Sequence, residues 1–272
     1  MDIKDMAIGV FDSGLGGLSA VKELMKVLPH ENIVYFGDTG RVPYGNRSRD
    51  TIIKYAQQDV NFLLKNNVKM IIAACGTVSS VATGLSSTLS VPFTGVVAPT
   101  CHAAAKSTKN GRIGVIGTTA TISSHSYKKL LSEINSDLKI FERDCPLFVP
   151  LVENGFTDPD DIIVKSVIEH YTREFIEKNV DTLILGCTHY PLLSEAIGKV
   201  LGDKVTLIDS GRATALYTAE LLRSRGLETT KETEGEYRFF VSDTPHNFEN
   251  MAGMFLSRDI HHRVTQIDIE EY

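Results

Sequence analysis

Short runs of aliphatic and β-branched residues alternate with longer amphipathic stretches along all 272 residues of the chain. Such alternation is typical of an α/β fold with mostly parallel sheets. The predicted strands are Ala7–Phe11, Ile33–Phe36, Met70–Ala74, Phe93–Val97, Ile113–Ile116, Leu138–Phe141, Thr182–Leu185, Val205–Ile208 and Tyr237–Ser242. The predicted helices are Leu18–Leu28, Arg49–Lys65, Ser124–Ile134, Asp160–Lys178, Pro191–Leu201 and Ala213–Arg225.

Part of this alternation repeats, because three segments of the first half recur in the second half in the same order. The matched pairs are Ala7–Ser13 with Arg112–Thr118, Val42-Pro43 with Val149-Pro150, and Met70–Cys75 with Thr182–Cys187. The length suits two domains. We therefore expect two similar α/β halves that face each other across a cleft, where ligands tend to bind at the carboxyl ends of parallel strands.

Two of the four cysteines occupy equivalent points of this repeat. Cys75 and Cys187 each follow an apolar strand and precede a small or hydroxyl-bearing residue and then a helix. A helix N-terminus stabilises a thiolate, so we expect a lowered pKa for both thiols. Cys101 and Cys145 lack this context and are expected to be structural. The four cysteines show no CxxC or zinc spacing, so neither a disulfide framework nor a metal site is predicted.

Two thiols that face each other can invert a stereocentre. One thiolate removes a proton from a carbon and the opposite thiol returns one, whereas a single base tends to return the proton to the face it left. This chemistry requires no cofactor. A redox pair is an alternative that the sequence leaves open, and it requires both sulfurs within bonding distance.

Two turns beside these strands contain further candidates. Asp12–Gly17 follows the first strand, but Ser19 stands where a dinucleotide fingerprint needs glycine, and no phosphate loop is present. Asp12 can cap a helix, or it can orient a thiol proton or a substrate ammonium. Asp38–Gly45 is typical of a turn, and the Gly45 backbone N–H can donate to a carboxylate.

Glu153 and His189 are candidates for assisting proton transfer to or from a thiol. Glu153 is expected in a loop after Pro150, and His189 lies two residues beyond Cys187. The remaining histidines form no pattern, and the pair His261-His262 is expected to be solvated.

Composition excludes other functions. The net charge of −6 argues against a nucleic-acid binder, which needs clustered Lys and Arg. No apolar run approaches the length of a transmembrane helix, and no N-terminal signal is visible. We therefore expect a cytoplasmic protein whose thiols stay reduced.

Together these motifs resemble those of glutamate racemases, in the cofactor-independent aspartate/glutamate racemase superfamily, over nearly the whole chain. The segments that carry the resemblance are Gly9–Gly17, Gly37–Thr39, Val42–Gly45, Ala74-Cys75 with Thr77, Pro150–Glu153 and Gly186–Leu193. The resemblance implies interconversion of L- and D-glutamate, which supplies D-glutamate for peptidoglycan, with no cofactor.

The resemblance also implies an architecture and residue roles. Residues 1–95 with 210–272 would form one α/β domain and 96–209 the other, related by a pseudo-two-fold axis, and a homodimer is expected. Cys75 resembles the base for D-glutamate and Cys187 the base for L-glutamate. Asp12, Glu153 and His189 resemble assisting residues, and the implied substrate contacts are Asp12, Ser13, Pro43, Tyr44, Gly45, Gly76, Thr77, Thr188 and His189.

One departure concerns Gly76, because the family usually has Asn at this point. A lost hydrogen bond to a charged group costs about 1.5–3 kcal/mol if nothing replaces it. Racemisation of aspartate or another amino acid is therefore one alternative. A thiol–disulfide enzyme that uses Cys75 and Cys187, and a non-catalytic amino-acid-binding module, are two others.

Overall fold

The structure is a computed structural model that describes residues 2–82, 84–257, 260 and 263–272. The pair His261-His262 lies outside the described residues. Every strand pairing is parallel, and the strands form two sheets. The strands are β1 (Ala7–Asp12), β2 (Ile33–Gly37), β3 (Val68–Ala73), β4 (Phe93–Gly95), β5 (Arg112–Gly117), β6 (Lys139–Asp144), β7 (Thr182–Leu185), β8 (Thr206–Asp209), β9 (Tyr237–Val241) and β10 (Val264–Gln266).

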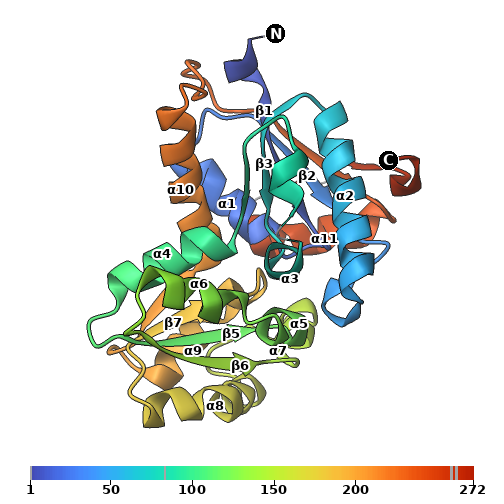
Figure 1. The fold of residues 1–272 in the computed structure, drawn as a ribbon. Coiled ribbons are helices and arrows are strands. Elements are labelled where there is room, and N and C mark those ends of the chain that lie inside the picture. Colours follow the sequence, from blue (N-terminus) through green and yellow to red (C-terminus); the bar gives the residue numbers. More distant parts are fainter. Residues whose placement is uncertain (1, 83, 258–259, 261–262) are drawn as a thin grey trace.

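The two sheets share one strand order. The four-stranded sheet runs β6-β5-β7-β8, and the six-stranded sheet contains the matching series β2-β1-β3-β4, extended by β9 and β10 beyond β2. The strands that carry the sequence repeat, β1 with β5 and β3 with β7, occupy matching places. The prediction of two similar parallel α/β halves is confirmed. Figure 1 shows the six-stranded sheet in the upper half of the molecule and the four-stranded sheet in the lower half.

Helices cover both sheets, as parallel strands require, because their two faces are apolar. The helices are α1 (Leu18–Val27), α2 (Arg49–Lys65), α3 (Gly76–Val81), α4 (Val97–Ser107), α5 (Thr119–Ser123), α6 (Ser126–Ile134), α7 (Phe148–Glu153), α8 (Ile162–Glu177), α9 (Ser194–Leu201), α10 (Ser210–Ser224) and α11 (Pro245–Leu256). Short 3-10 helices are η1 (Ile3–Asp5), η2 (Tyr44–Asn46), η3 (Leu85–Thr88), η4 (Tyr190–Leu193) and η5 (Ile269–Glu271).

The predicted elements differ from the structure at several boundaries. The expected helix over Ser124–Ile134 is α6, which begins only at Ser126 because His125 before it has a left-handed backbone with φ of 53°. The expected strand Phe93–Val97 ends at Gly95, and Val97 begins α4. The sequence analysis expected a helix after Cys75, where α3 lies, but did not predict α4, α5, α7, α11 or β10.

The core connects the two halves. One apolar cluster extends from β1, through Ile8 and Val10, to Leu183 and Leu185 of β7. Helix α10 packs against α1 on one side and α4 on the other (Figure 1). The interface between the two halves is therefore packed, and it holds the carboxyl ends of the two sheets close together.

None of the helices in the described residues is both long and apolar enough to cross a membrane.

Candidate active site

A cavity of about 310 Å³ lies where the carboxyl ends of the two sheets meet. The structure brings to its wall all but one of the residues that the sequence singled out. Those that line it are Ser13, Pro43, Tyr44, Gly45, Cys75, Gly76, Thr77, Glu153, Cys187, Thr188 and His189. The exception, Asp12, is buried at the end of β1 and does not line the cavity.

The Cys75 side of the cavity combines a thiol with a hydroxyl. Cys75 follows β3 and is the N-cap residue of α3, as the sequence pattern indicated. Its Sγ lies 3.6 Å from Oγ of Ser13, to which the thiol donates. Ser13 follows directly after β1, so the parallel pairing of β1 with β3 brings the two side chains together.

Burial determines the protonation of this thiol. Cys75 is only 6% exposed, and burial raises the pKa of the thiol to about 12, with a smaller contribution from the charge of Asp12. The prediction of a lowered pKa for Cys75 is therefore wrong. The backbone N–H of Val78 and the Ser13 hydroxyl favour the thiolate and lower the pKa. The loss of hydration of the thiolate on burial raises the pKa by more than these two contacts lower it.

Asp12 forms a turn and does not cap a helix. Its Oδ2 accepts the backbone N–H of Gly14 at 3.0 Å, whereas α1 begins after Gly17 without a side-chain cap. Burial raises the Asp12 pKa, an effect that the charge of His189 and nearby backbone N–H groups oppose. Oδ1 of Asp12 is buried with no hydrogen-bond partner among the described residues. A buried carboxylate oxygen of this kind can accept from a bound cation.

The Cys187 side of the cavity combines a thiol with an ion pair. His189 Nδ1 lies 3.9 Å from Sγ of Cys187, and His189 Nε2 lies 3.0 Å from Oε1 of Glu153. Burial disfavours the charged imidazole, but the contacts with Cys187 and Glu153 outweigh it and raise the His189 pKa to about 10. An imidazolium at this position can donate to both neighbours, and it stabilises negative charge on the sulfur.

Glu153 was expected in a loop, and this prediction is wrong. It is the last residue of α7, a helix that includes Val149-Pro150. Its partner in the sequence repeat, Val42-Pro43, lies in a loop before η2. Both dipeptides nevertheless line the cavity, so the repeat places matching residues in different local structures.

Two glycines allow the halves of the molecule to approach closely. A Cβ on Gly76 would lie 2.5 Å from the carbonyl oxygen of Gly186, which precedes Cys187. A Cβ on Gly16 would lie 2.1 Å from Oγ1 of Thr188. The glycine-rich turn after β1 therefore serves close packing against the segment that carries Cys187.

The sequence analysis missed part of the wall of the cavity. Thr118, Thr119 and Thr121 line it, and Thr118 Oγ1 lies 3.2 Å from Thr77 Oγ1 and 2.9 Å from Thr121 Oγ1. They lie at the end of β5, the counterpart of the Asp12-Ser13 turn, so the repeat was the signal that could have identified them.

Cys145 also lines the cavity, and the prediction that it lacks a strand-end position is wrong. Strand β6 extends to Asp144, three residues beyond its predicted end, so Cys145 directly follows a strand. Cys101 lies within α4 and is fully buried. All four cysteines carry free thiols.

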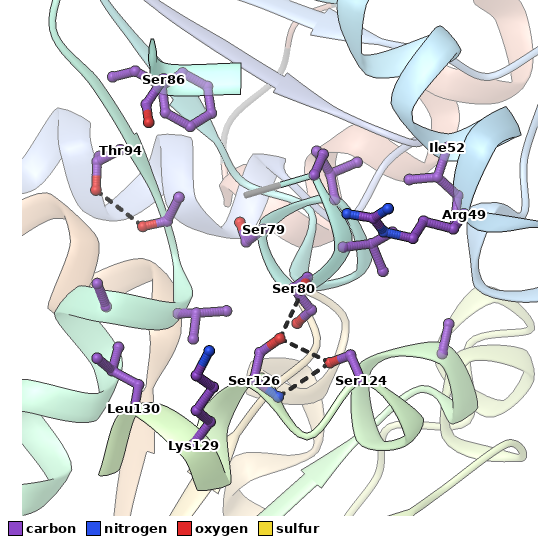
Figure 2. Close-up of a pocket in the computed structure, with 18 of the residues that line it drawn as sticks. Arg49, Ile52, Ser79, Ser80, Ser86, Thr94, Ser124, Ser126, Lys129 and Leu130 are labelled. Carbon is purple, nitrogen blue, oxygen red and sulfur yellow. Dashed lines mark hydrogen bonds between the residues drawn. The ribbon is translucent and has the colours of Figure 1, made fainter. Parts of the chain in front are cut away.

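A larger cavity of about 810 Å³ lies along the remaining residues of α3 (Figure 2). Arg49, Ser79 and Lys129 are among the side chains that line it. Ser126 Oγ donates to the Ser80 carbonyl at 2.7 Å there, which joins α6 to α3. None of the four cysteines lines this cavity. The smaller cavity, which is lined by Cys75 and Cys187 from matching strand ends of the two halves, is therefore the candidate active site.

Comparison with known proteins agrees with this site. Residues 20–218 match the family model for Asp/Glu/Hydantoin racemase, and the chain belongs to this family. Relatives that cover nearly the whole chain include glutamate racemases. That of Geobacter metallireducens is 45% identical over 92% of this chain and 92% of its own length.

Solved structures of glutamate racemases have the same fold. The enzyme of Bacillus anthracis superposes with a TM-score of 0.92 at 38% identity, covering 97% of this chain and 98% of that chain. The enzyme of Francisella tularensis, solved in complex with D-glutamate, superposes with a TM-score of 0.91 at 38% identity, covering 99% of this chain and 100% of that chain. The resemblance predicted from the sequence motifs is thus confirmed.

Proposed function

We propose that the protein is a glutamate racemase that interconverts L- and D-glutamate by proton transfer at Cα between Cys75 and Cys187. The observation that carries this proposal is that the two strand-end thiols, from matching positions of two similar halves, line one cavity. Its volume of about 310 Å³ is at the lower end for ligand sites, which suits a single amino acid.

In the direction from L- to D-glutamate, Cys187 acts as the base. The adjacent His189 imidazolium stabilises the negative charge of the Cys187 thiolate, and Glu153 holds the imidazole in place. The proton passes from Cα of the substrate to Sγ of Cys187, and Cys75 donates its proton to the opposite face of the carbanion. Burial keeps Cys75 protonated, which is the state that this step requires.

In the opposite direction the roles exchange. Cys75 must begin as the thiolate, and the ammonium group of bound glutamate can favour that form by its charge. Asp12 lies behind the cavity wall, and we assign its unpartnered Oδ1 to the charge of this ammonium across the adjacent Ser13. The Ser13 hydroxyl, 3.6 Å from this sulfur, can donate to the thiolate.

Hydroxyls and backbone N–H groups around the cavity bind the two carboxylates of the substrate. The residues that we assign to these contacts are Ser13, Tyr44, Gly45, Gly76, Thr77, Thr188 and His189, together with Thr118 and Thr121. Pro43, which has no donor group, contributes an apolar contact with the substrate. Backbone N–H groups and hydroxyls can hold a carboxylate without a basic patch, which agrees with the acidic composition.

We also propose the wider setting that the family resemblance implies. Residues 1–95 with 210–272 form one domain and 96–209 the other, the protein is a homodimer, and the D-glutamate supplies peptidoglycan synthesis. A cytoplasmic location is consistent with chemistry that needs two reduced thiols.

The deciding experiment follows glutamate in heavy water with purified protein and no pyridoxal phosphate. We expect exchange of the α-proton together with racemisation, and a lower rate with aspartate. Absence of both exchange and racemisation would overturn the proposal, and faster turnover of aspartate would reassign the substrate.

The same sample also tests the other two alternatives. A thiol–disulfide enzyme would crosslink Cys75 to Cys187 reversibly under mild oxidant, without proton exchange. A binding module would bind glutamate, measured by calorimetry, and leave the α-proton in place.

A further inference from the structure

The loop that carries Tyr44 and Gly45 into the cavity is held from behind by buried carboxylates. The Tyr44 ring is 1% exposed, and its hydroxyl contacts Asp38 Oδ2 and, at 3.2 Å, Asp59 Oδ2. Both aspartates are fully buried. Burial raises the Tyr44 pKa above its ordinary value, so the hydroxyl keeps its proton and remains a donor. The position of Tyr44 therefore depends on where these two carboxylates are held.

One guanidinium group pairs with both aspartates, and burial together with the charge of Asp38 raises the Asp59 pKa well above its ordinary value, so a single positive charge suffices. Arg41 Nε donates to Asp38 Oδ2 at 2.6 Å, and Nη2 donates to Asp59 Oδ1 at 3.3 Å. The guanidinium also lies 4.1 Å from the centre of the Tyr55 ring. Buried carboxylates are tolerated only when they are paired, and the planar fork of arginine pairs two of them at once. The compact ammonium of lysine has no such fork.

The guanidinium is in turn held by the far end of the sequence. Arg41 Nη1 donates to Gln58 Oε1 at 2.5 Å and to Glu270 Oε1 at 3.3 Å. Gln58 Nε2 donates to the other oxygen of Glu270 at 3.3 Å. Ile269 is buried beside them in the apolar cluster that includes Phe62 and Cys75, which fixes η5 against α2.

A second distant segment reaches the same carboxylates. Ser242, directly after β9, donates from Oγ to Asp38 Oδ1 at 2.7 Å and accepts the backbone N–H of Gly40 at 2.9 Å. Strands β9 and β10 have no counterpart in the four-stranded sheet. The residues that follow each of them contact the loop that carries Tyr44 and Gly45, which we call the substrate loop.

We propose that Arg41, Asp38, Asp59 and Glu270 form a clamp that positions Tyr44 and Gly45 for the carboxylate of the substrate. The proposal rests on the proposed function for the identity of that substrate. None of the four clamp residues lines the cavity, so they are positioning residues and not catalytic ones. The segment around Glu270 thereby becomes part of the binding apparatus for glutamate.

The kinetic test uses Arg41→Lys and Glu270→Gln, with Glu271→Gln as the matched control on the adjacent exposed residue. Because the thiols are untouched, we expect KM to rise about tenfold in Arg41→Lys while kcat changes less than about threefold. Glu270→Gln should raise KM about two- to threefold, and Glu271→Gln should leave it unchanged. An unchanged KM in Arg41→Lys, or a fall in kcat alone, would overturn the clamp.

A second measurement needs no activity. Amide hydrogen exchange of peptides that cover residues 42–47 should be faster in Arg41→Lys and Glu270→Gln than in Glu271→Gln. Equal exchange in all three would overturn the clamp. If wild-type protein fails to racemise glutamate, the proposed function is wrong, and the exchange comparison still decides whether the clamp orders the loop.

Discussion

The thiols of Cys75 and Cys187 have different surroundings, although they lie at matching strand ends of the cavity. Cys75 contacts a hydroxyl, that of Ser13, and burial holds its pKa near 12. Cys187 contacts an imidazole that is itself paired with Glu153. The similar halves of the molecule therefore supply one thiol that burial keeps protonated and one that lies beside an imidazole whose pKa is raised to about 10.

This difference constrains how substitutions affect the reaction. The two enantiomers of glutamate have equal free energies in water, so their equilibrium constant is one. The values of kcat/KM for the two directions must then be equal in every variant. A substitution on one side of the cavity lowers both values by the same factor, and only isotope effects reveal which side was changed.

The largest expected effect follows from removing either thiol. Cys75→Ala and Cys187→Ala should each lower kcat/KM for racemisation by about 10⁴-fold, the upper range for loss of a general base or acid. Circular dichroism of the glutamate product pool measures this. Cys101→Ala, which removes a buried thiol inside α4, serves as the control. Full activity in either active-site variant would refute the two-base assignment.

A smaller effect is expected when His189 is replaced by Asn. We expect kcat/KM to fall about 10²-fold in both directions, because Cys187 loses its partner for proton transfer. The step at Cys187 then limits the rate, so α-deuterated L-glutamate should show a larger isotope effect than α-deuterated D-glutamate.

Ser13→Ala on the opposite side should reverse this isotope pattern. Its contact with the Cys75 sulfur is a single hydroxyl, so the fall in kcat/KM should be the smaller of the two. Equal isotope effects from the two enantiomers, in both variants, would contradict the assignment of one thiol to each enantiomer.

A still smaller effect is expected at the contact between the halves. In Gly76→Ala the new Cβ would lie 2.5 Å from the Gly186 carbonyl, so the two strand ends must separate. Because misplacement of reacting groups is costly, we expect kcat to fall about tenfold. Gly84→Ala is the matched control, since nothing lies within 4 Å of its Cβ. Wild-type kcat in Gly76→Ala would show that the close approach is not needed.

The smallest expected effect is a shift in the pH profile of Glu153→Gln. The contact with Glu153 helps raise the His189 pKa to about 10, so its loss lets the imidazolium lose its proton at lower pH. Activity should fall only a few-fold at neutral pH, but the alkaline decline should move down by about one unit. Glu169→Gln, on an exposed position of α8, should leave the profile in place. If the alkaline decline stays in place in Glu153→Gln, deprotonation of His189 is not its cause.

The sequence predicted those parts of the site that local pattern determines. Buried strands are visible in the sequence as continuous apolar runs. Such a run lies directly or closely before Ser13, Cys75 and Cys187. Because carboxyl ends of parallel strands gather at one edge, strand-end residues of two facing sheets lie near one another. The same reasoning missed Cys145 because the polar residues of β6 concealed the true end of that strand.

Features that depend on distant contacts could not be predicted in this way. Burial raises the Cys75 pKa, and burial follows from packing that a helix N-terminus does not reveal. The pairing of Arg41 with Glu270 joins residues 229 positions apart, and no local pattern marks it. Likewise, glycine is needed at position 76 because the carbonyl of Gly186, in the other half, leaves no room for a Cβ.

The contact between Arg41 and Glu270 has a consequence for the order of events during synthesis on the ribosome. The strands and helices of the four-stranded sheet are complete by Asp209, whereas the substrate loop waits for residues made 229 positions after Arg41. At translation rates of about 5–20 residues per second, roughly 10–50 seconds separate the synthesis of Arg41 from that of Glu270. A nascent chain that has passed residue 187 but has not reached residue 270 therefore contains both thiols but lacks a fully anchored substrate loop.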